Sequence, residues 1–144
     1  MNTEKSKFDI IYGIDNVINT QLELISDARH RLDMCMDLTQ PHLVVESRQL
    51  RQRFLDNKTK GIKLRILTEI NKDNLYYSKE LLSMVDELRH LDGIQGNFYV
   101  SEKEYAAAPA LFHNRSKSSS YMMMIYSTTK EIVQHQQHIF TCGL

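Results

Sequence analysis

Cysteine and long apolar runs are scarce in this chain of 144 residues, and each shortage excludes a class of protein. The two cysteines, Cys35 and Cys142, form neither a CxxC motif nor a metal-site spacing, which indicates a reduced, cytoplasmic setting. No apolar run reaches the length of a membrane-spanning helix, and no signal peptide is recognisable. We therefore expect a cytoplasmic protein without a membrane partner, a metal or a cofactor.

Net charge is also lacking, since 18 Lys and Arg residues balance 18 Asp and Glu residues. A neutral chain has no overall field that attracts nucleic acid or an anionic membrane. We therefore expect no nucleic-acid partner, although a local basic patch is compatible with a neutral total. The length and a hydrophobic content of 42% suit one domain, residues 1–144, with a real core.

The clearest structural signal is the stretch 50–69. It predicts a helix that ends at Gly61, where a left-handed conformation is cheap, and then a buried strand through Ile62, Leu64 and Ile66. A helix between two strands favours a parallel pair of strands. Thr68 and Glu69 then lie at the carboxyl end of a strand, where open α/β sheets bind ligands.

The rest of the chain predicts a series of alternating elements. We expect a long amphipathic helix from Phe8 to about Leu32, which packs on the sheet or forms a dimer interface. The remaining expected elements are a strand at 32–38, a turn at 39–42, a helix at 75–88, one or two strands around a charged turn at 101–104, a strand at 121–126 and a final helix from about 128.

This order predicts an α/β fold with a mixed, mostly parallel sheet flanked by helices. The ends of its strands would gather Thr39, Gln40 and His42 beside Thr68 and Glu69 as a ligand site. At such a position an ordinary exposed loop histidine is more frequent than a ligand-binding one, and both interpretations of His42 stay open. His135 and His138 lie three apart on the final helix, but without a third ligand they predict no metal site.

Residues 112–131, FHNRSKSSSYMMMIYSTTKE, resemble the catalytic motif of phospholipase D-like domains. That motif has a histidine, a lysine two positions on, an aspartate five further, and a Gly-Ser pair seven residues after the aspartate. Here the same positions hold His113, Arg115, Ser120, and the pair Ser127 and Thr128.

The resemblance implies that His113 would be the nucleophile and Arg115 a phosphate ligand, in a site completed by a second chain. Arginine differs from lysine in reach and geometry. Ser120 cannot supply the carboxylate that orients a charged histidine. We therefore expect a domain of this fold that has lost catalysis.

The segments DELRHLDGIQGNF, VSEKEY and KEIVQHQQHIF are similar to the sensory domains of this family that precede archaeal histidine kinases. This resemblance implies a homodimeric, non-catalytic sensory domain of a longer two-component signalling protein, which binds a small molecule, for example an anion, or a protein. The expected ligand-binding residues are Thr39, Gln40, His42, Thr68, Glu69, His113, Arg115 and Ser127.

Two alternatives remain open. The first is a small dimeric phosphodiesterase or nuclease of the phospholipase D type, with His113 as the nucleophile. The second is a structural dimerisation module whose first and last helices form the interface.

Overall fold

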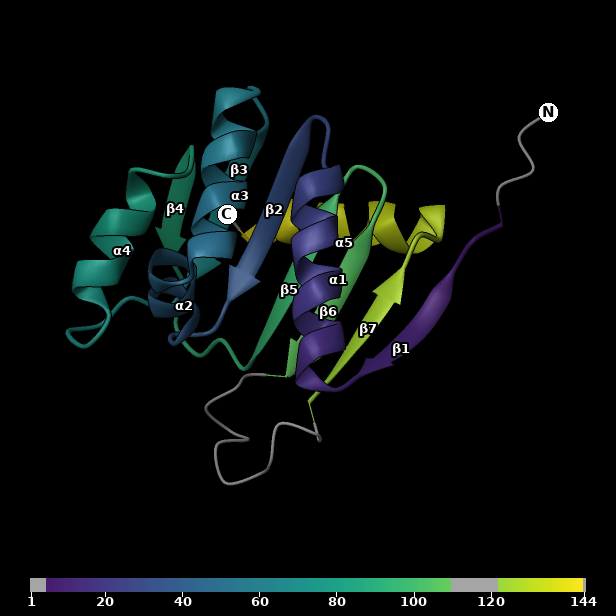
Figure 1. Ribbon diagram of the computed structural model, residues 1–144, viewed down its shortest axis with the longest axis horizontal. Coiled ribbons are helices and arrows are strands. Elements are labelled where there is room, and N and C mark those ends of the chain that lie inside the picture. Colours follow the sequence, from purple (N-terminus) through teal and green to yellow (C-terminus); the bar gives the residue numbers. More distant parts are fainter. Residues whose placement is uncertain (1–4, 110–121, 144) are drawn as a thin grey trace.

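Seven strands and five helices make up the described residues, 5–109 and 122–143, of the computed structural model (Figure 1). In chain order they are β1 (Phe8–Tyr12), α1 (Ile14–Asp27), β2 (Arg31–Met36), α2 (Gln40–Glu46), α3 (Arg48–Thr59), β3 (Lys63–Thr68), α4 (Leu75–Leu82), β4 (Glu87–His90), β5 (Gly96–Ser101), β6 (Tyr105–Pro109), β7 (Met123–Ser127) and α5 (Lys130–Gly143). None of these helices is long and apolar enough to cross a membrane.

The strands form one sheet in the order β1-β7-β6-β5-β2-β3-β4. The α/β class with a mixed sheet is therefore confirmed, but the expectation of a mostly parallel sheet is wrong. Only β3 runs parallel to its neighbours β2 and β4, and the other four pairs are antiparallel. The reason is the connections, because β2–β3 and β3–β4 are joined through helices, whereas a short turn joins β5 to β6.

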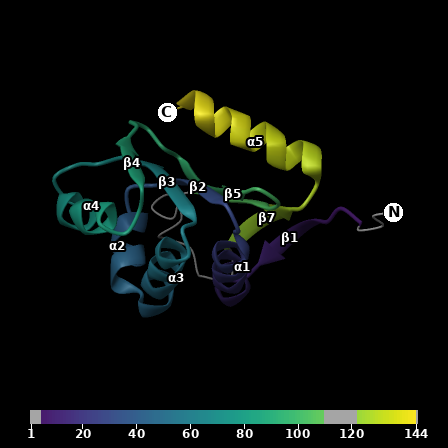
Figure 2. The ribbon, with the colours of Figure 1, turned by 90° about the horizontal axis from the view of Figure 1, so that it is seen from above.

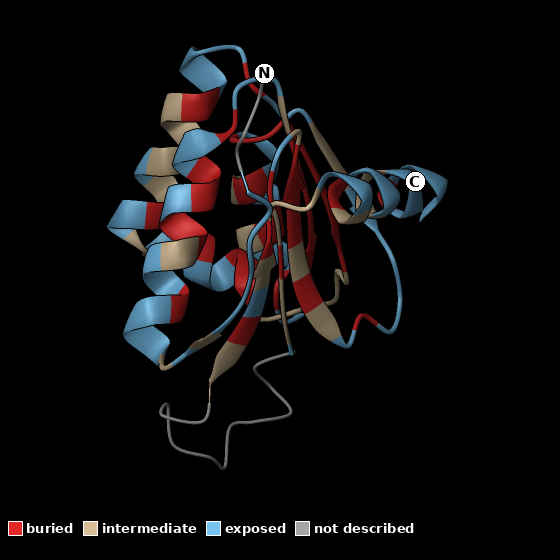
Figure 3. Ribbon diagram, turned by 90° about the vertical axis from the view of Figure 1, so that its right-hand side faces the viewer, coloured by how far each residue is buried: buried red, intermediate tan, exposed pale blue. Residues whose placement is uncertain are grey.

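The sheet separates two layers of helices, as Figure 2 shows. Helices α1 to α4 cover one face and α5 covers the other. The larger core lies between the sheet and helices α1 to α4. Figure 3 shows buried residues on the sides of these helices and of the sheet that face each other. The smaller core lies under α5 and consists of Cys35, Leu67, Ile94 and Phe140, with Phe98 packed against it.

The predicted unit around Gly61 is confirmed. Helix α3 begins after Ser47, whose hydroxyl accepts from the amide of Leu50 at 3.3 Å, and ends two residues before Gly61. Gly61 has a φ of +80°, the left-handed conformation that ends a helix cheaply. Strand β3 follows and pairs parallel with β2, as the sequence pattern predicted.

The expected first helix is wrong over its first turns. Residues Phe8–Tyr12 form β1, an edge strand paired antiparallel with β7, and the helix starts only after Gly13. Gly13 has a φ of +89°, which interrupts any helix. Apolar residues in this segment fit both a helical and an alternating period, and pairing with β7 decides between them.

Two further element boundaries differ from the expectation. The predicted turn at 39–42 belongs largely to α2, which begins at Gln40 with Pro41 in its first turn, a position where proline suits a helix. The predicted helix at 75–88 ends at Leu82. The last residues of the predicted range belong to β4 instead. The amide of Asp86, just before β4, donates to the carbonyl of Leu64, and this hydrogen bond joins the segment to the sheet.

Candidate functional site

Three of the predicted site residues, Thr39, Gln40 and Thr68, lie at the carboxyl ends of β2 and β3. We call the rim of the sheet formed by these strand ends the Thr39 edge, and the opposite rim the Ser127 edge. Their polar groups are engaged in local structure. The amide of Thr39 donates to Asp37 Oδ1 at 2.8 Å, and the hydroxyl of Thr68 donates to the carbonyl of Met36 at 3.0 Å. The hydroxyl of Tyr99 donates to Gln40 Oε1 at 3.5 Å.

Two other predicted residues, Glu69 and His42, have their own local contacts. Glu69 Oε1 accepts from the amide of Gly93 at 2.7 Å and so holds the turn after β4. The exposed ring of His42, on α2, meets the ring of Tyr77 edge-on with centroids 4.6 Å apart. Neither of these contacts involves Thr39 or Thr68.

Asp37 and Asn97 form the centre of this edge, and the sequence analysis missed both. Asp37 is fully buried. Its amide donates to Asn97 Oδ1 at 2.7 Å, and Asn97 Nδ2 donates back to Asp37 Oδ2 at 2.7 Å. The pair ties the end of β2 to the start of β5. The only available signal was a carboxylate directly after a buried strand.

The structure places Ser127 at the opposite edge of the sheet from Thr39 and Thr68. Strand β7 runs antiparallel to β6, so its carboxyl end pairs with Tyr105, the first residue of β6. The Ser127 hydroxyl donates to the carbonyl of Lys7 and accepts from the amide of Thr129, each at 3.0 Å. Ser127 therefore lies apart from Thr39 and Thr68, the described predicted residues at the opposite ends of the strands.

His113 and Arg115 lie outside the described residues, as does Ser120. Their predicted roles stay predictions. The described residues on either side, Pro109 and Met122, lie at the edge of the sheet that carries Thr39, not at the edge that carries Ser127.

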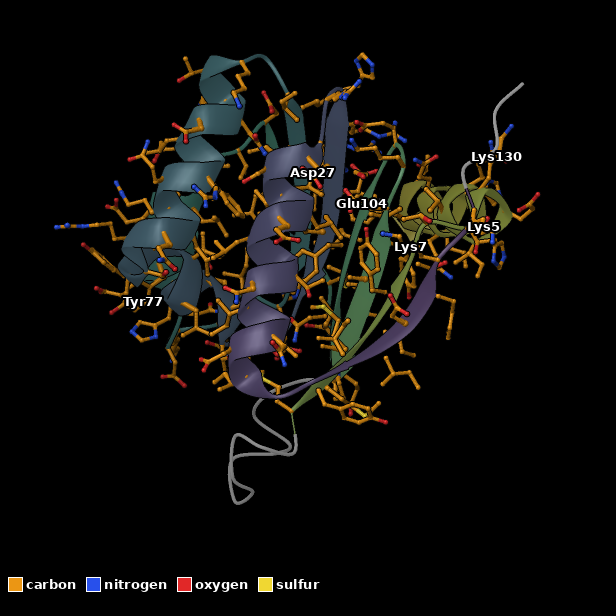
Figure 4. All side chains as sticks on the ribbon, turned by 45° about the vertical axis from the view of Figure 1, so that its right-hand side comes forward. Lys5, Lys7, Asp27, Tyr77, Glu104 and Lys130 are labelled. Atoms are coloured by element: carbon orange, nitrogen blue, oxygen red, sulfur yellow. The ribbon has the colours of Figure 1, made fainter. Side chains whose placement is uncertain are left out.

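A wide hollow at the Ser127 edge collects four lysines from three parts of the chain. Lys5 and Lys7 precede β1, and Lys130 opens α5 (Figure 4). Lys103 lies in the turn between β5 and β6. We call this the lysine hollow. Its volume is about 680 Å³, and Ser6, Asp27, Glu104 and Thr128 complete its lining.

Strand pairing explains why these lysines meet. Because β1 pairs with β7, the residues before β1 lie beside the junction of β7 and α5. There the amide of Lys7 donates to the Thr128 hydroxyl at 2.9 Å, and the amide of Thr128 donates to the carbonyl of Lys7 at 3.0 Å. The Thr128 hydroxyl therefore ties the segment before β1 to the start of α5.

Glu104 is the buried acid in the wall of the lysine hollow, with 6% of its surface exposed. The hydroxyl of Tyr126 donates to its Oε2, and its Oε1 has no hydrogen-bond partner among the described residues. Burial raises the pKa of Glu104, and the nearby charge of Asp27 adds to this, while the Tyr126 hydrogen bond and Lys103 act in the opposite direction.

The positive surface continues beyond the lysine hollow. A neighbouring hollow of about 410 Å³ shares Asp27 and Lys103 with it and adds Arg29 and Lys60. We define the basic band as Lys5, Lys7, Arg29, Lys60, Lys103 and Lys130. It follows one edge of the sheet, where the ends of α1 and α3, the β5–β6 turn and the start of α5 lie. Such a band can hold an extended anion.

Comparison with known proteins shows the fold. The sequence matches no protein-family model and no curated protein. NucT from Helicobacter pylori is similar in structure, with a TM-score of 0.70 and 13% identity over 95% of this chain and 94% of that one. Nuc from Salmonella typhimurium, a phospholipase D family member, has a TM-score of 0.69 and 9% identity over 95% of this chain and 93% of that one.

A third similar structure is TrmBL2, described as an archaeal chromatin protein with a novel mode of DNA binding. It has a TM-score of 0.63 and 18% identity over 98% of this chain, which spans 53% of the length of TrmBL2. A DNA-binding protein of this fold contradicts the expectation of no nucleic-acid partner. That expectation rested on a net charge of +0, which averages over the surface and conceals the basic band.

The predicted link to histidine kinases finds no support in these three structures, none of which is described as a kinase sensor. The predicted fold does find support in them. NucT and Nuc each match this chain over 95% of its length and over at least 93% of their own, with TM-scores of 0.70 and 0.69. This chain therefore has a phospholipase D-like fold.

Proposed function

We propose that this domain binds the phosphate backbone of nucleic acid along the basic band. The observation that carries the proposal is the convergence of six cations, from five separate parts of the sequence, at one end of the strands in a chain whose total charge is zero. The likeness to TrmBL2, a DNA-binding protein, supports the same ligand class.

The chemistry of the lysine hollow suits phosphate. Ammonium groups are compact donors that make short, charge-assisted hydrogen bonds to phosphate oxygens. The amino end of α5, a helix of 14 residues, opens beside the hollow and adds the positive end of its dipole. Asp27 and Glu104 reduce the net positive charge, so we expect moderate affinity that is sensitive to salt.

The test is DNA binding, measured by fluorescence anisotropy over a series of salt concentrations. We expect the variant Lys103→Glu, Lys130→Glu to bind at least about tenfold more weakly and to reduce the salt slope by about two. The control variant Lys79→Glu reverses one charge on α4, at the other end of the sheet (Figure 1), and should change the affinity by less than about twofold. Equal losses of affinity in the two variants, or an affinity that does not depend on salt concentration, would refute the proposal.

A second candidate function is phosphodiester hydrolysis, with His113 as nucleophile and Arg115 as phosphate ligand. The motif spacing and the likeness to Nuc, a phospholipase D family member, favour it. No histidine of the described residues lines the lysine hollow. A covalent phosphohistidine that forms on the chain during reaction with a generic diester, and is absent in His113→Asn, would establish this function. If no such intermediate is trapped and the diester is not turned over, this function is excluded.

The sensory role in a longer signalling protein stays a prediction. It requires a ligand whose binding changes the position of an outgoing helix. Nucleic-acid binding requires no such ligand, so the two functions can be tested separately.

A further inference from the structure

A second cavity lies on the α1–α4 face of the sheet, towards the Thr39 edge and away from the lysine hollow. It has a volume of about 270 Å³. Helix α1 forms one wall with Ile14 and Ile18, and Leu43 and Leu50 of α2 and α3 form the second. The floor is the sheet, where β5, β6 and the start of β7 meet.

The lining of this cavity is mostly apolar, and none of its described lining residues is charged. Three polar side chains lie together at one side. Gln21 Nε2 donates to the hydroxyl of Tyr99 at 2.7 Å, and that hydroxyl donates to Gln40 Oε1 at a longer 3.5 Å. Gln21 and Gln40 are 8% and 5% exposed, so water reaches this polar side poorly.

We propose that this cavity binds a small, uncharged, mainly apolar molecule of about ten heavy atoms that carries one hydrogen-bonding group. The size follows from the volume, since a 150 Å³ apolar cavity holds benzene and this one is nearly twice as large. The hydrogen-bonding group pairs with Gln40 Oε1, because its bond to Tyr99 is long enough to be exchanged for a better donor.

No charged side chain of residues 5–109 and 122–143 lines this cavity, and this favours an uncharged ligand. An anion placed here would lose its hydration and find no cation among these residues in exchange. A ligand of this cavity therefore differs from an anion, which the sequence analysis gave as one example of a small-molecule ligand. Protein interiors are close-packed and leave few voids larger than a water molecule, so a preformed apolar cavity with a polar side has the usual character of a small-molecule site.

The neutral aromatic indole is a suitable probe, because its ring fills an apolar space and its one N–H can donate to Gln40. The chain has no tryptophan, so fluorescence at the red edge of indole absorption reports the probe alone. We expect saturable binding to the full chain. Indole-3-carboxylate, which adds one negative charge, should bind at least about tenfold more weakly.

Two adjacent alanines of β6 supply a matched pair of variants. Ala108 lines the cavity and faces the larger core, whereas Ala107 pairs with Phe98 and Ile125 on the other face of the sheet. Ala108→Phe fills the cavity and should weaken indole binding at least about tenfold, while Ala107→Phe should leave it within about twofold. Ala108→Leu is the smaller replacement if the phenylalanine prevents folding.

The outcomes separate clearly. Saturable binding that is lost in the Ala108 variants and kept in Ala107→Phe supports the proposal. No saturable binding to the wild-type chain overturns it, as does equal affinity in the two phenylalanine variants or equal binding of the carboxylate. DNA binding through the basic band is unaffected by any of these results.

Discussion

Arg65 and Asp33 form a buried ion pair under α5, and removing the cation should destabilise the protein strongly. The two residues are register partners on β3 and β2. Arg65 Nε lies 2.8 Å from Asp33 Oδ1, and Arg65 Nη2 lies 2.9 Å from Oδ2. The guanidinium also stacks over the ring of Phe140, 5.2 Å from its centroid, so the pair supports the carboxyl half of α5.

The magnitude follows from burial. Asp33 is 0% exposed, so Arg65→Met leaves a carboxylate in the core without its main partner, which typically costs about 3–5 kcal/mol. Arg31, whose Nε lies 3.2 Å from Asp33 Oδ2 and whose side chain is 39% exposed, compensates in part. We therefore expect a loss of about 3 kcal/mol, which is a large share of the roughly 5–15 kcal/mol that holds such a domain folded.

Urea unfolding followed by circular dichroism measures this loss. With an m-value of about 2 kcal/mol/M, the midpoint should fall by about 1.5 M. The double variant Asp33→Asn, Arg65→Met removes the unpaired charge and should regain about half of the loss or more. The control is Arg89→Met, which removes an exposed partner of Glu87 and should cost about 0–1 kcal/mol.

Two results would refute this reasoning. One is a loss of less than about 1 kcal/mol for Arg65→Met, since the buried pair would then behave like the exposed pair of Arg89. The other is a double variant as unstable as the single one, because the unpaired charge would then not be the cause.

Three further predictions concern single side chains. Burial raises the pKa of Glu104, so the folded chain keeps a proton that the unfolded chain releases. The contribution of Glu104 to the free energy of unfolding should be fully present below the ordinary glutamate pKa and be lost as pH rises through the raised one. Glu104→Gln cannot titrate and should lessen this loss in thermal unfolding curves recorded from about pH 4 to about pH 7; an unchanged slope would rule out Glu104 as its source. Burial, with a smaller contribution from Asp37, raises the pKa of the Cys35 thiol to about 11. A thiol reagent should therefore label only the exposed Cys142 in the native protein and both cysteines in urea, and labelling of Cys35 in the native protein would contradict its buried position. Gly61→Ala should lower the free energy of unfolding by about 1 kcal/mol because Gly61 has a φ of +80°, whereas the adjacent Lys60→Ala, at a φ of −77°, should lower it little. Equal losses in the two variants would show that backbone conformation is not the cause.

Local signals in the sequence predicted several elements correctly. The end of α3 at Gly61, the buried strand β3 and the charged turn between β5 and β6 all follow from turn residues and side-chain period. The apolar run at 121–126 likewise lies largely in β7. These features depend on neighbours within a few residues, so the sequence alone contains the information for them.

Strand direction was not available from the same signals. A period of two predicts a strand but not its neighbour, and Phe8–Tyr12 becomes β1 only because β7 is present to pair with it. The direction of β7 in turn moves Ser127 to the edge opposite Thr68. A site predicted from the carboxyl ends of strands therefore divides in two when the sheet is mixed.

The sequence by itself determined the α/β class and the main helix–strand unit, because hydrophobic period and helix-ending glycine act locally. Only the tertiary structure decided where charge gathers. The basic band unites Lys5 and Lys130, which are distant in sequence, through the pairing of β1 with β7. Net charge is a sum over residues and carries no positions, whereas phosphate binding depends on the distances between cations.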